Sequence, residues 1–252
     1  MITSKDNKHV KNLIALQTKA KERKKQNLFV VEGIRMVEET PRHLLRELYC
    51  SESFAAKNPD RYDCEILSDA VYKSVSDTQS PQGILAVVEK PHYELWDYLH
   101  TDAAPLFLVL EDIQDPGNLG TMMRTAEGAG ATAVILSPNT VDLFNPKTIR
   151  STMGSIYRLP YLVSDNLAET IATLQSAGVS VYAAHLKGKK DYCDCDYTGA
   201  TAFLIGNEGN GLSDEIAGLA DTYIRIPMEG QLESLNAAVS AALLMYECHR
   251  QR

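Results

Sequence analysis

The chain has 252 residues, of which 44% are hydrophobic and 23% are charged, and its formal net charge is −8. This length is enough for two modest domains, and the composition excludes a fibrous or fully disordered chain. No apolar run approaches the roughly 20 residues that cross a membrane, and the amino terminus lacks the apolar core of a secretion signal, so we expect a cytoplasmic protein with no membrane partner.

Basic side chains gather at the amino terminus. Residues 1–25 hold eight Lys or Arg against two acidic residues, whereas the remainder holds 17 basic and 31 acidic residues. Such asymmetry indicates a segment that faces nucleic acid, because neutralising phosphates releases counterions. The candidate nucleic-acid ligands in this segment are Lys11, Lys21, Arg23 and Lys24. A solvated helix face that binds nothing is the alternative, and charge alone leaves both open.

The first ninety residues alternate between short helices and strands. Ser4 or Asp6 can cap a helix that ends before Asn27 and turns Val10 and Leu13 to one side. Apolar runs then predict strands at 28–31, 45–50, 63–67 and 83–88. This alternation predicts a small α/β domain over residues 1–90.

The pattern decays over residues 91–104, which we interpret as a linker, and a second alternation occupies residues 105–252. Its apolar runs predict strands at 106–110, 133–136, 179–183, 202–205 and 223–226, with helices at 167–174 and 212–219 and a last one from Ser234 to about Arg250. Continuous apolar strands separated by helices are typical of a mainly parallel sheet.

The last helix is apolar on nearly every side, as Leu235, Val239, Leu243 and Met245 show. A helix that is apolar all round is buried all round, which one sheet cannot provide at the end of a chain. We therefore expect part of this helix to form a subunit interface.

Several common sites are disfavoured. The glycines of residues 206–211 are spaced as the reverse of a dinucleotide fingerprint, and Gly188-Lys189-Lys190 lacks the flanking residues of a phosphate loop. The five cysteines are an odd number and scattered, which argues against a disulfide framework, and Cys193 and Cys195 lack the spacing and partners of a zinc site. We expect no metal.

Three loops carry more polar residues than a scaffold needs: 110–124, 203–212 and 225–236. The second and third each begin as an apolar strand-like run, break into glycine and polar residues, and lead into a helix-like segment, and the first has the same form. Ligands of α/β proteins sit beyond the carboxyl ends of strands, where glycine lets the backbone approach them.

The three loops resemble the three sequence motifs of the SpoU, or TrmH, family of RNA ribose 2′-O-methyltransferases, a branch of the knotted SPOUT methyltransferases. Residues 115–126 match the first motif, 204–212 the second and 226–236 the third, in order. The segment from Lys11 to Gly33 is similar, less specifically, to the family's substrate-binding domain, a small α/β module related to ribosomal proteins that bind kinked RNA.

This resemblance implies S-adenosylmethionine as the cofactor, bound in a carboxyl-terminal trefoil knot, and a homodimer formed by the catalytic domains. Arg124 would grip the target phosphate and ribose oxygen, Asn118 would orient, Glu208 would brace Arg124 or Asn118, and Asn236 would point at the reacting centre. Ser234 completes the catalytic set, although it could equally cap the last helix.

The cofactor would be held largely by backbone groups, with Gly206, Ile226 and Leu235 around the adenine. The full set of implied cofactor ligands is Leu204, Ile205, Gly206, Asn207, Gly211, Ile226, Met228, Ser234 and Leu235. A polar segment with Asn145, Lys147, Arg150 and Ser151 is expected to face RNA.

The leading hypothesis is therefore an S-adenosylmethionine-dependent 2′-O-methyltransferase acting on 23S ribosomal RNA, with transfer RNA as the close alternative. A non-catalytic RNA-binding protein of the same fold is a hypothesis of another class, which the intact set of polar motif residues disfavours. An oxidoreductase with a glycine-rich cofactor loop is a third, and it predicts tight nicotinamide or flavin binding.

Overall fold

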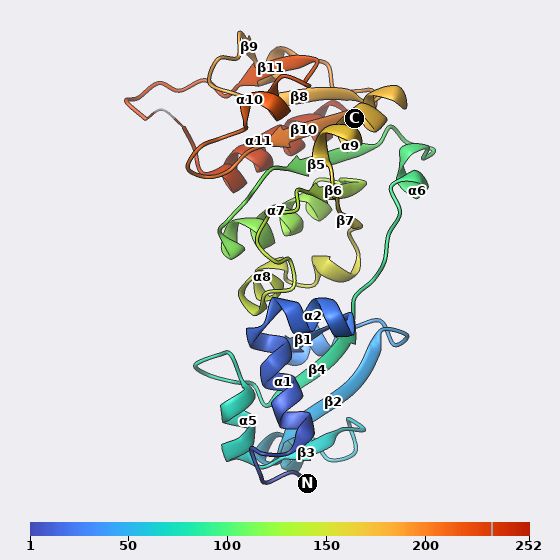
Figure 1. Cartoon of the computed structure of the whole chain (residues 1–252), viewed down its shortest axis with the longest axis vertical. Coiled ribbons are helices and arrows are strands. Elements are labelled where there is room, and N and C mark those ends of the chain that lie inside the picture. Colours follow the sequence, from blue (N-terminus) through green and yellow to red (C-terminus); the bar gives the residue numbers. More distant parts are fainter. Residues whose placement is uncertain (233) are drawn as a thin grey trace. The chain divides into compact units, whose positions relative to one another are not determined.

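The computed structural model describes residues 1–232 and 234–252, and the chain folds as two compact units (Figure 1). Unit 1 consists of residues 1–92 and 142–157, and unit 2 of residues 93–141 and 158–252. Unit 1 is thus assembled from two stretches, the second of which interrupts unit 2 in sequence. The expected domain bounds of 1–90 and 105–252 did not include this interruption and stay a prediction.

Unit 1 contains a four-stranded sheet in the order β1-β4-β2-β3. Its strands are β1 (Leu28–Glu32), β2 (Leu45–Ser51), β3 (Glu65–Leu67) and β4 (Ile84–Glu89). β4 is antiparallel to β1 and β2, whereas β3 is parallel to β2. The helices are α1 (Lys8–Thr18), α2 (Ala20–Gln26), α3 (Ile34–Glu38), α4 (Glu52–Lys57), α5 (Asp69–Val75) and, from the interrupting stretch, α8 (Pro146–Thr152) with the 3-10 turn Ser155–Tyr157.

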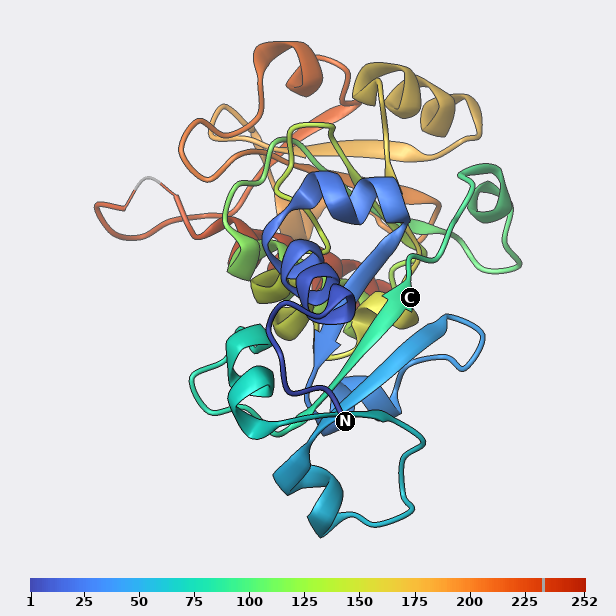
Figure 2. The same ribbon diagram turned by 60° about the horizontal axis from the view of Figure 1, so that its bottom comes forward.

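The amino-terminal basic segment is two helices packed on the sheet. Asn7 caps α1 by accepting from the backbone of His9, so neither Ser4 nor Asp6 is the cap that the sequence suggested. Lys19 is extended and separates α1 from α2, which ends at Asn27 with a left-handed φ of 56°. Val10, Leu13 and Leu16 of α1 are buried in the core of unit 1, where α1 contacts β1 and α5 (Figure 2).

Unit 2 contains a seven-stranded sheet in the order β7-β6-β5-β10-β8-β11-β9, and every pair of neighbours is parallel. The strands are β5 (Leu106–Leu110), β6 (Ala133–Leu136), β7 (Tyr161–Val163), β8 (Ser180–Ala184), β9 (Lys190–Asp191), β10 (Thr201–Ile205) and β11 (Thr222–Arg225). The predicted parallel α/β domain is confirmed, and continuous apolar runs mark its central strands because both of their faces are buried.

The helices of unit 2 are α6 (Trp96–Leu99), α7 (Pro116–Gly128), α9 (Leu167–Ser176), α10 (Asp214–Ala217) and α11 (Ala237–Gln251), with a 3-10 turn at Tyr192–Asp194. α9 and α10 pack with alternate side chains of the central strands, such as Val109 and Leu204, in one core cluster. α11 packs against α7 and β10. It begins at Ala237 and is capped by Asn236, so the expected start at Ser234 is wrong.

Candidate functional site

A cavity of about 1210 Å³ lies in unit 2 beyond the carboxyl ends of β8, β10 and β11 and at the start of α11. Four segments line it: 184–187, 205–214, 224–228 and 234–237, joined by Asn118 and Ser240. Open parallel sheets bind ligands at this edge because the loops there are free to diverge while the strands stay fixed.

Eight of the nine residues expected to hold the cofactor line this cavity. They are Ile205, Gly206, Asn207, Gly211, Ile226, Met228, Ser234 and Leu235. Leu204 does not, because its side chain is fully buried among the core residues that pack with α9. The structure therefore gathers two distant motifs at one edge of the sheet, while the role of each residue stays a prediction.

The loop after β10 closes on itself. Asn207 and Gly211 exchange backbone hydrogen bonds of 3.0 and 2.9 Å, and the Asn207 side chain accepts from the backbone of Gly209 and Asn210 at 2.8 and 3.2 Å. Gly206 is required here, because a Cβ at this position would lie 2.1 Å from the backbone carbon of Gly211. The loop therefore presents backbone rather than side chain to the cavity.

Glu208, on the same loop, holds the loop that precedes α7. Its carboxylate accepts hydrogen bonds from the backbone of Gln114 and Asp115, at 3.0 and 3.1 Å, and from the Asn118 side chain at 3.0 Å. Partial burial raises the pKa of Glu208, but these hydrogen bonds outweigh it and hold the pKa below its ordinary value. Glu208 therefore positions Asn118 as an ionised carboxylate and is unsuited to accept a proton near neutral pH.

Asn118 connects Glu208 to the last helix. While its amide nitrogen donates to Glu208, its Oδ1 accepts from Asn236 Nδ2 at 3.0 Å, and Asn236 Oδ1 accepts from the backbone of Ala238 and Val239 at the start of α11. Each amide nitrogen donates to an oxygen and each amide oxygen accepts from a nitrogen, so both amides have one favourable orientation. One hydrogen-bonded chain thus joins all three motifs.

Arg124 lies on α7, six residues after Asn118, and its side chain is exposed. It does not line the cavity, and within residues 1–232 and 234–252 its guanidinium has no hydrogen bond or ion pair. The alternative that Glu208 braces Arg124 is thus not what the structure shows. An arginine without an internal partner keeps its full donor set for an external anion.

Sequence reasoning missed a fourth loop, residues 184–187, which follows β8 and lines the cavity. His185 stacks on Tyr223 at a ring distance of 5.1 Å and accepts at Nδ1 from the backbone of Lys187 at 3.0 Å. A Cβ at Gly188 would lie 2.7 Å from the backbone of Ile224. The signal in the sequence is Gly188, a glycine soon after the predicted strand at 179–183.

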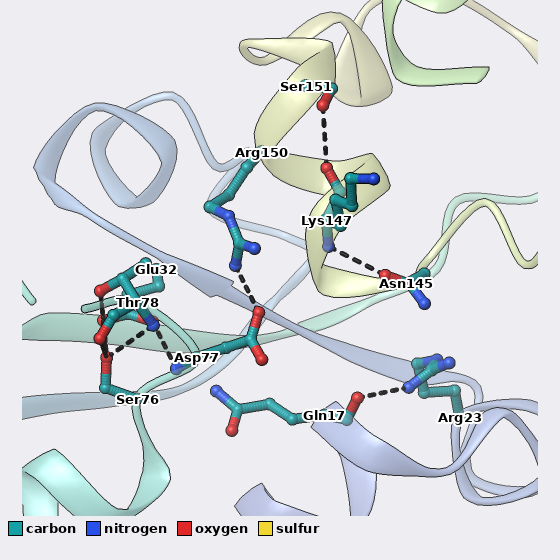
Figure 3. A network of polar contacts seen from close by, with 10 residues as sticks. All are labelled: Gln17, Arg23, Glu32, Ser76, Asp77, Thr78, Asn145, Lys147, Arg150 and Ser151. Atoms are coloured by element: carbon teal, nitrogen blue, oxygen red, sulfur yellow. Dashed lines mark hydrogen bonds and ion pairs between the residues drawn. The ribbon is translucent and has the colours of Figure 1, made fainter. Parts of the chain in front are cut away.

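In unit 1, Arg23 is buried and corrects the prediction that it contacts RNA. Its guanidinium donates to Asp142 at 2.7 Å and to the backbone carbonyl of Leu16 at 2.6 Å. It also donates to the backbone carbonyl of Gln17 at 3.0 Å (Figure 3). A guanidinium is tolerated at an exposure of 3% only when it is paired in this way. Lys21 and Lys24 are exposed on α2, and Lys11 is exposed and pairs with Asp6 at 2.9 Å.

The polar segment expected to face RNA forms α8 and belongs to unit 1. Asn145 caps α8 by accepting from the backbone of Lys147, and the Ser151 hydroxyl donates to the Lys147 carbonyl (Figure 3). These two side chains are thus used within the helix. Arg150 extends from α8 and donates to Asp77 at 2.6 Å.

No group of three or more His, Cys, Asp or Glu within residues 1–232 and 234–252 is arranged to hold a metal ion, and all five cysteines are free thiols. No helix in the same ranges is long and apolar enough to cross a membrane.

Residues 105–246 match the model of the SpoU rRNA Methylase family, which covers more than half of the chain. The chain belongs to the SpoU rRNA methylase family. Residues 7–86 of this SpoU methylase also match the MRM3-like substrate binding domain. Over 249 residues, it is 37% identical to the 23S rRNA (guanosine(2553)-2′-O)-methyltransferase RlmP of Bacillus subtilis (strain 168), covering 97% of each chain.

Solved structures agree with this membership. The SpoU methyltransferase AviRb from Streptomyces viridochromogenes, in complex with AdoMet, is 28% identical and matches with a TM-score of 0.86 over 97% of this chain and 98% of its own. The AdoMet-bound rRNA methyltransferase from Sinorhizobium meliloti is 32% identical, with a TM-score of 0.85 over 99% and 97%. Unit 2 has the SPOUT fold, and this SpoU methylase is an S-adenosylmethionine-dependent RNA ribose 2′-O-methyltransferase.

Proposed function

We propose that this SpoU methylase transfers a methyl group to a ribose 2′-hydroxyl of 23S ribosomal RNA. The observation that carries the proposal is the hydrogen-bonded chain of Glu208, Asn118 and Asn236, which joins the three motif loops beside one cavity. A scaffold alone does not require such a connection between three loops that are far apart in sequence.

The extent of the matches supports ribosomal over transfer RNA. The match to the TrmH/SpoU tRNA modifying enzyme of A. aeolicus covers 62% of this chain. The match to a second structure, described as concerning the 2-OH methylation of C/U34 on tRNA, covers 59% of this chain and 96% of that chain. RlmP and the S. meliloti rRNA methyltransferase instead match over 97% and 99% of this chain, which includes unit 1. These two rRNA methyltransferases thus match nearly the whole chain, whereas the two tRNA-modifying enzymes match about three fifths of it.

The cavity fits S-adenosylmethionine. It is large enough for a nucleoside with an amino-acid tail, since ligand sites commonly enclose about 300–1,000 Å³. Ile226, Met228 and Leu235 supply apolar surface for an adenine ring, and the glycines of the loop after β10 leave backbone groups within reach of it. When bound there, S-adenosylmethionine supplies the methyl group from a sulfonium.

The residues of the chain then have to orient the hydroxyl and help it to lose its proton. Asn118 and Asn236 hold the edge of the cavity in one arrangement. A guanidinium is a poor general base at neutral pH, so Arg124 does not take the proton. Arg124 instead donates hydrogen bonds to a phosphate and to the ribose oxygen. Orientation of this kind lowers the reaction barrier by several kcal/mol, up to about 7–11 in well-aligned reactions. The proton leaves to water.

We also propose that the molecule is a homodimer through the outer face of α11. Val239 and Tyr246 are about half exposed there, at 48% and 49%, although the opposite face of the helix is buried. A trefoil knot in the cofactor loops and a cytoplasmic location, where ribosomal RNA is found, complete the proposal. Family membership supports both.

The decisive test measures transfer of tritiated methyl from S-adenosylmethionine to ribosomal RNA, followed by digestion to nucleosides. We expect label on ribose, a loss of at least about 100-fold with Arg124→Ala, and little recovery with Arg124→Lys because the lysine lacks the planar fork. Arg158→Ala is the matched control, since Arg158 is another exposed arginine of unit 2 but pairs with Glu127. Undiminished transfer by Arg124→Ala, or label on bases, contradicts the proposal.

A further inference from the structure

Unit 1 contains two arginine–aspartate ion pairs that differ in burial and in the number of hydrogen-bond partners of the arginine. The Arg23 side chain is 4% exposed and satisfied by one carboxylate and two carbonyls. The Arg150 side chain is 36% exposed and has one partner among the described residues, Asp77, whose side chain is 46% exposed. The first pair is part of the interior, whereas the second is open to exchange with an anion from solution.

The backbone of the loop that carries Asp77 is held in place by Glu32. Glu32, at the end of β1, accepts from the hydroxyls of Ser76 and Thr78 at 2.5 and 3.1 Å and from the backbone of Asp77 at 3.2 Å (Figure 3). The loop that carries Asp77 is thus shaped by Glu32 and does not depend on the Asp77 side chain. Asp77 can release Arg150 without unfolding its own loop.

The contact leaves most of the guanidinium unused. Arg150 donates to Asp77 through Nη1 alone, although a guanidinium has five N–H donors in a fork that matches a phosphate. An ion pair this exposed is weak and is screened by salt. A phosphate that can accept two of these hydrogen bonds is a better partner than the one carboxylate oxygen now in contact.

We propose that the Asp77 carboxylate holds the position on Arg150 that a backbone phosphate of the RNA substrate takes on binding. This inference rests on the proposed function, whose RNA would be bound by unit 1, and it adds a selective element. Asp77 competes with every phosphate for Arg150. Only RNA shaped to place a phosphate at this point displaces it, so Asp77 lowers affinity for other RNA.

The test measures binding of the full-length protein to purified 23S rRNA over a series of salt concentrations. At about 0.15 M salt, Asp77→Asn tightens binding about two- to five-fold, because the competitor has lost its charge. Arg150→Ala weakens binding and lowers the slope of log affinity against log salt by about 0.7–0.9, one phosphate contact. The double variant binds as Arg150→Ala does, since Asp77 acts only through Arg150.

Glu38→Gln is the matched control. Glu38 pairs with Arg61 at 2.7 Å in the same unit, with exposures of 44% and 56%, and its loss changes the net charge equally. Equal tightening by Glu38→Gln, or by Asp77→Asn in the Arg150→Ala background, reduces the effect to net charge and overturns the inference. So does unchanged affinity of Asp77→Asn. If the unaltered protein neither binds nor methylates ribosomal RNA, the proposed function fails with it.

Discussion

Glu208 shows how one carboxylate can organise three loops. It accepts from two backbone amides before α7 and from the Asn118 side chain, which is itself held by Asn236 of the third motif. Three accepted hydrogen bonds favour the ionised carboxylate, and the lowered pKa of Glu208 agrees with this. We therefore interpret Glu208 as a positioning residue whose effect on the reaction passes through Asn118.

Replacement of Glu208 by Gln tests this interpretation. Gln has a single acceptor oxygen and an amide group that would face N–H donors, so at least one of the three hydrogen bonds is lost. We expect a destabilisation of about 1–3 kcal/mol and a fall of about 10- to 100-fold in single-turnover methyl transfer. Because Glu208 takes no proton, the pH dependence of the residual transfer between about pH 6 and 9 should keep its shape. A general base would instead lose an inflection.

The pH dependence of stability has a defined sign. The pKa of Glu208 is lower in the folded chain than its ordinary value of 4.5. Its stabilising contribution is therefore fully present above about pH 4.5 and is lost as the pH falls through the folded pKa. In denaturant titrations, the difference in unfolding free energy between the unaltered protein and Glu208→Gln should be constant above about pH 5.5 and shrink below 4.5. A constant difference down to pH 3 would contradict this.

At the scale of elements, α11 is a helix that carries more apolar residues than unit 2 buries. Its apolar residues outnumber the positions that unit 2 buries, which are Ala238, Ala241, Leu244, Met245 and Cys248. The remaining apolar surface, around Val239 and Tyr246, is exposed in the single chain. This is the surface for which the sequence predicted a second subunit, and a partner would remove it from water.

Val239→Asp should convert the proposed dimer to a monomer that keeps its fold, because the new charge would be buried only in the interface. Sedimentation equilibrium at micromolar concentration measures the change, and thermal unfolding at low concentration checks the monomer. Leu244→Asp is the contrasting variant, since Leu244 is fully buried within unit 2 and its replacement should unfold the chain. A monomeric unaltered protein at micromolar concentration would contradict the proposed interface.

In the basic helices α1 and α2, the pattern of charges does not predict which basic side chain is buried. Their lysines are exposed, as charge patterning suggested, but Arg23 stands in the same run and is buried against Asp142, more than a hundred residues away. Nothing in the local sequence distinguishes it from Lys24. The position of the partner determines which basic side chain is buried, because burial of a guanidinium requires a carboxylate within reach.

At the scale of the whole molecule, unit 1 is completed by residues 142–157, which interrupt the sequence of unit 2. Phe144 packs on Phe29 at a ring distance of 4.7 Å, and the Tyr157 hydroxyl shares a hydrogen bond of 2.9 Å with that of Thr40. With the Arg23 pair, these contacts make the interrupting stretch part of the core of unit 1. Residues 1–92 alone are therefore an incomplete domain.

A fragment of residues 1–92 should be markedly less stable than unit 1 in the full chain. Removal of the second stretch exposes Phe29 and leaves the Arg23 guanidinium without its carboxylate, and loss of one partner of a buried ion pair alone costs about 3–5 kcal/mol. Hydrogen exchange of the β1 amides compares the fragment with the full chain. Equal protection in both would show that the second stretch is dispensable.

The sequence by itself determined the two α/β units, the parallel strands at the centre of unit 2 and the loops that carry the motifs. These follow from local physics: apolar runs form buried strands, and glycine-rich segments after them form loops at the ligand edge. Family resemblance added the cofactor and the reaction, which membership in the SpoU rRNA methylase family confirms.

Only the tertiary structure decided which partner each polar side chain has. It assigned Glu208 to Asn118 and not to Arg124, placed Arg23 in the interior, set Asp77 against Arg150, and moved α8 into unit 1. These choices depend on contacts between residues 70 to 120 positions apart, and charge or periodicity within a short window carries no information about them.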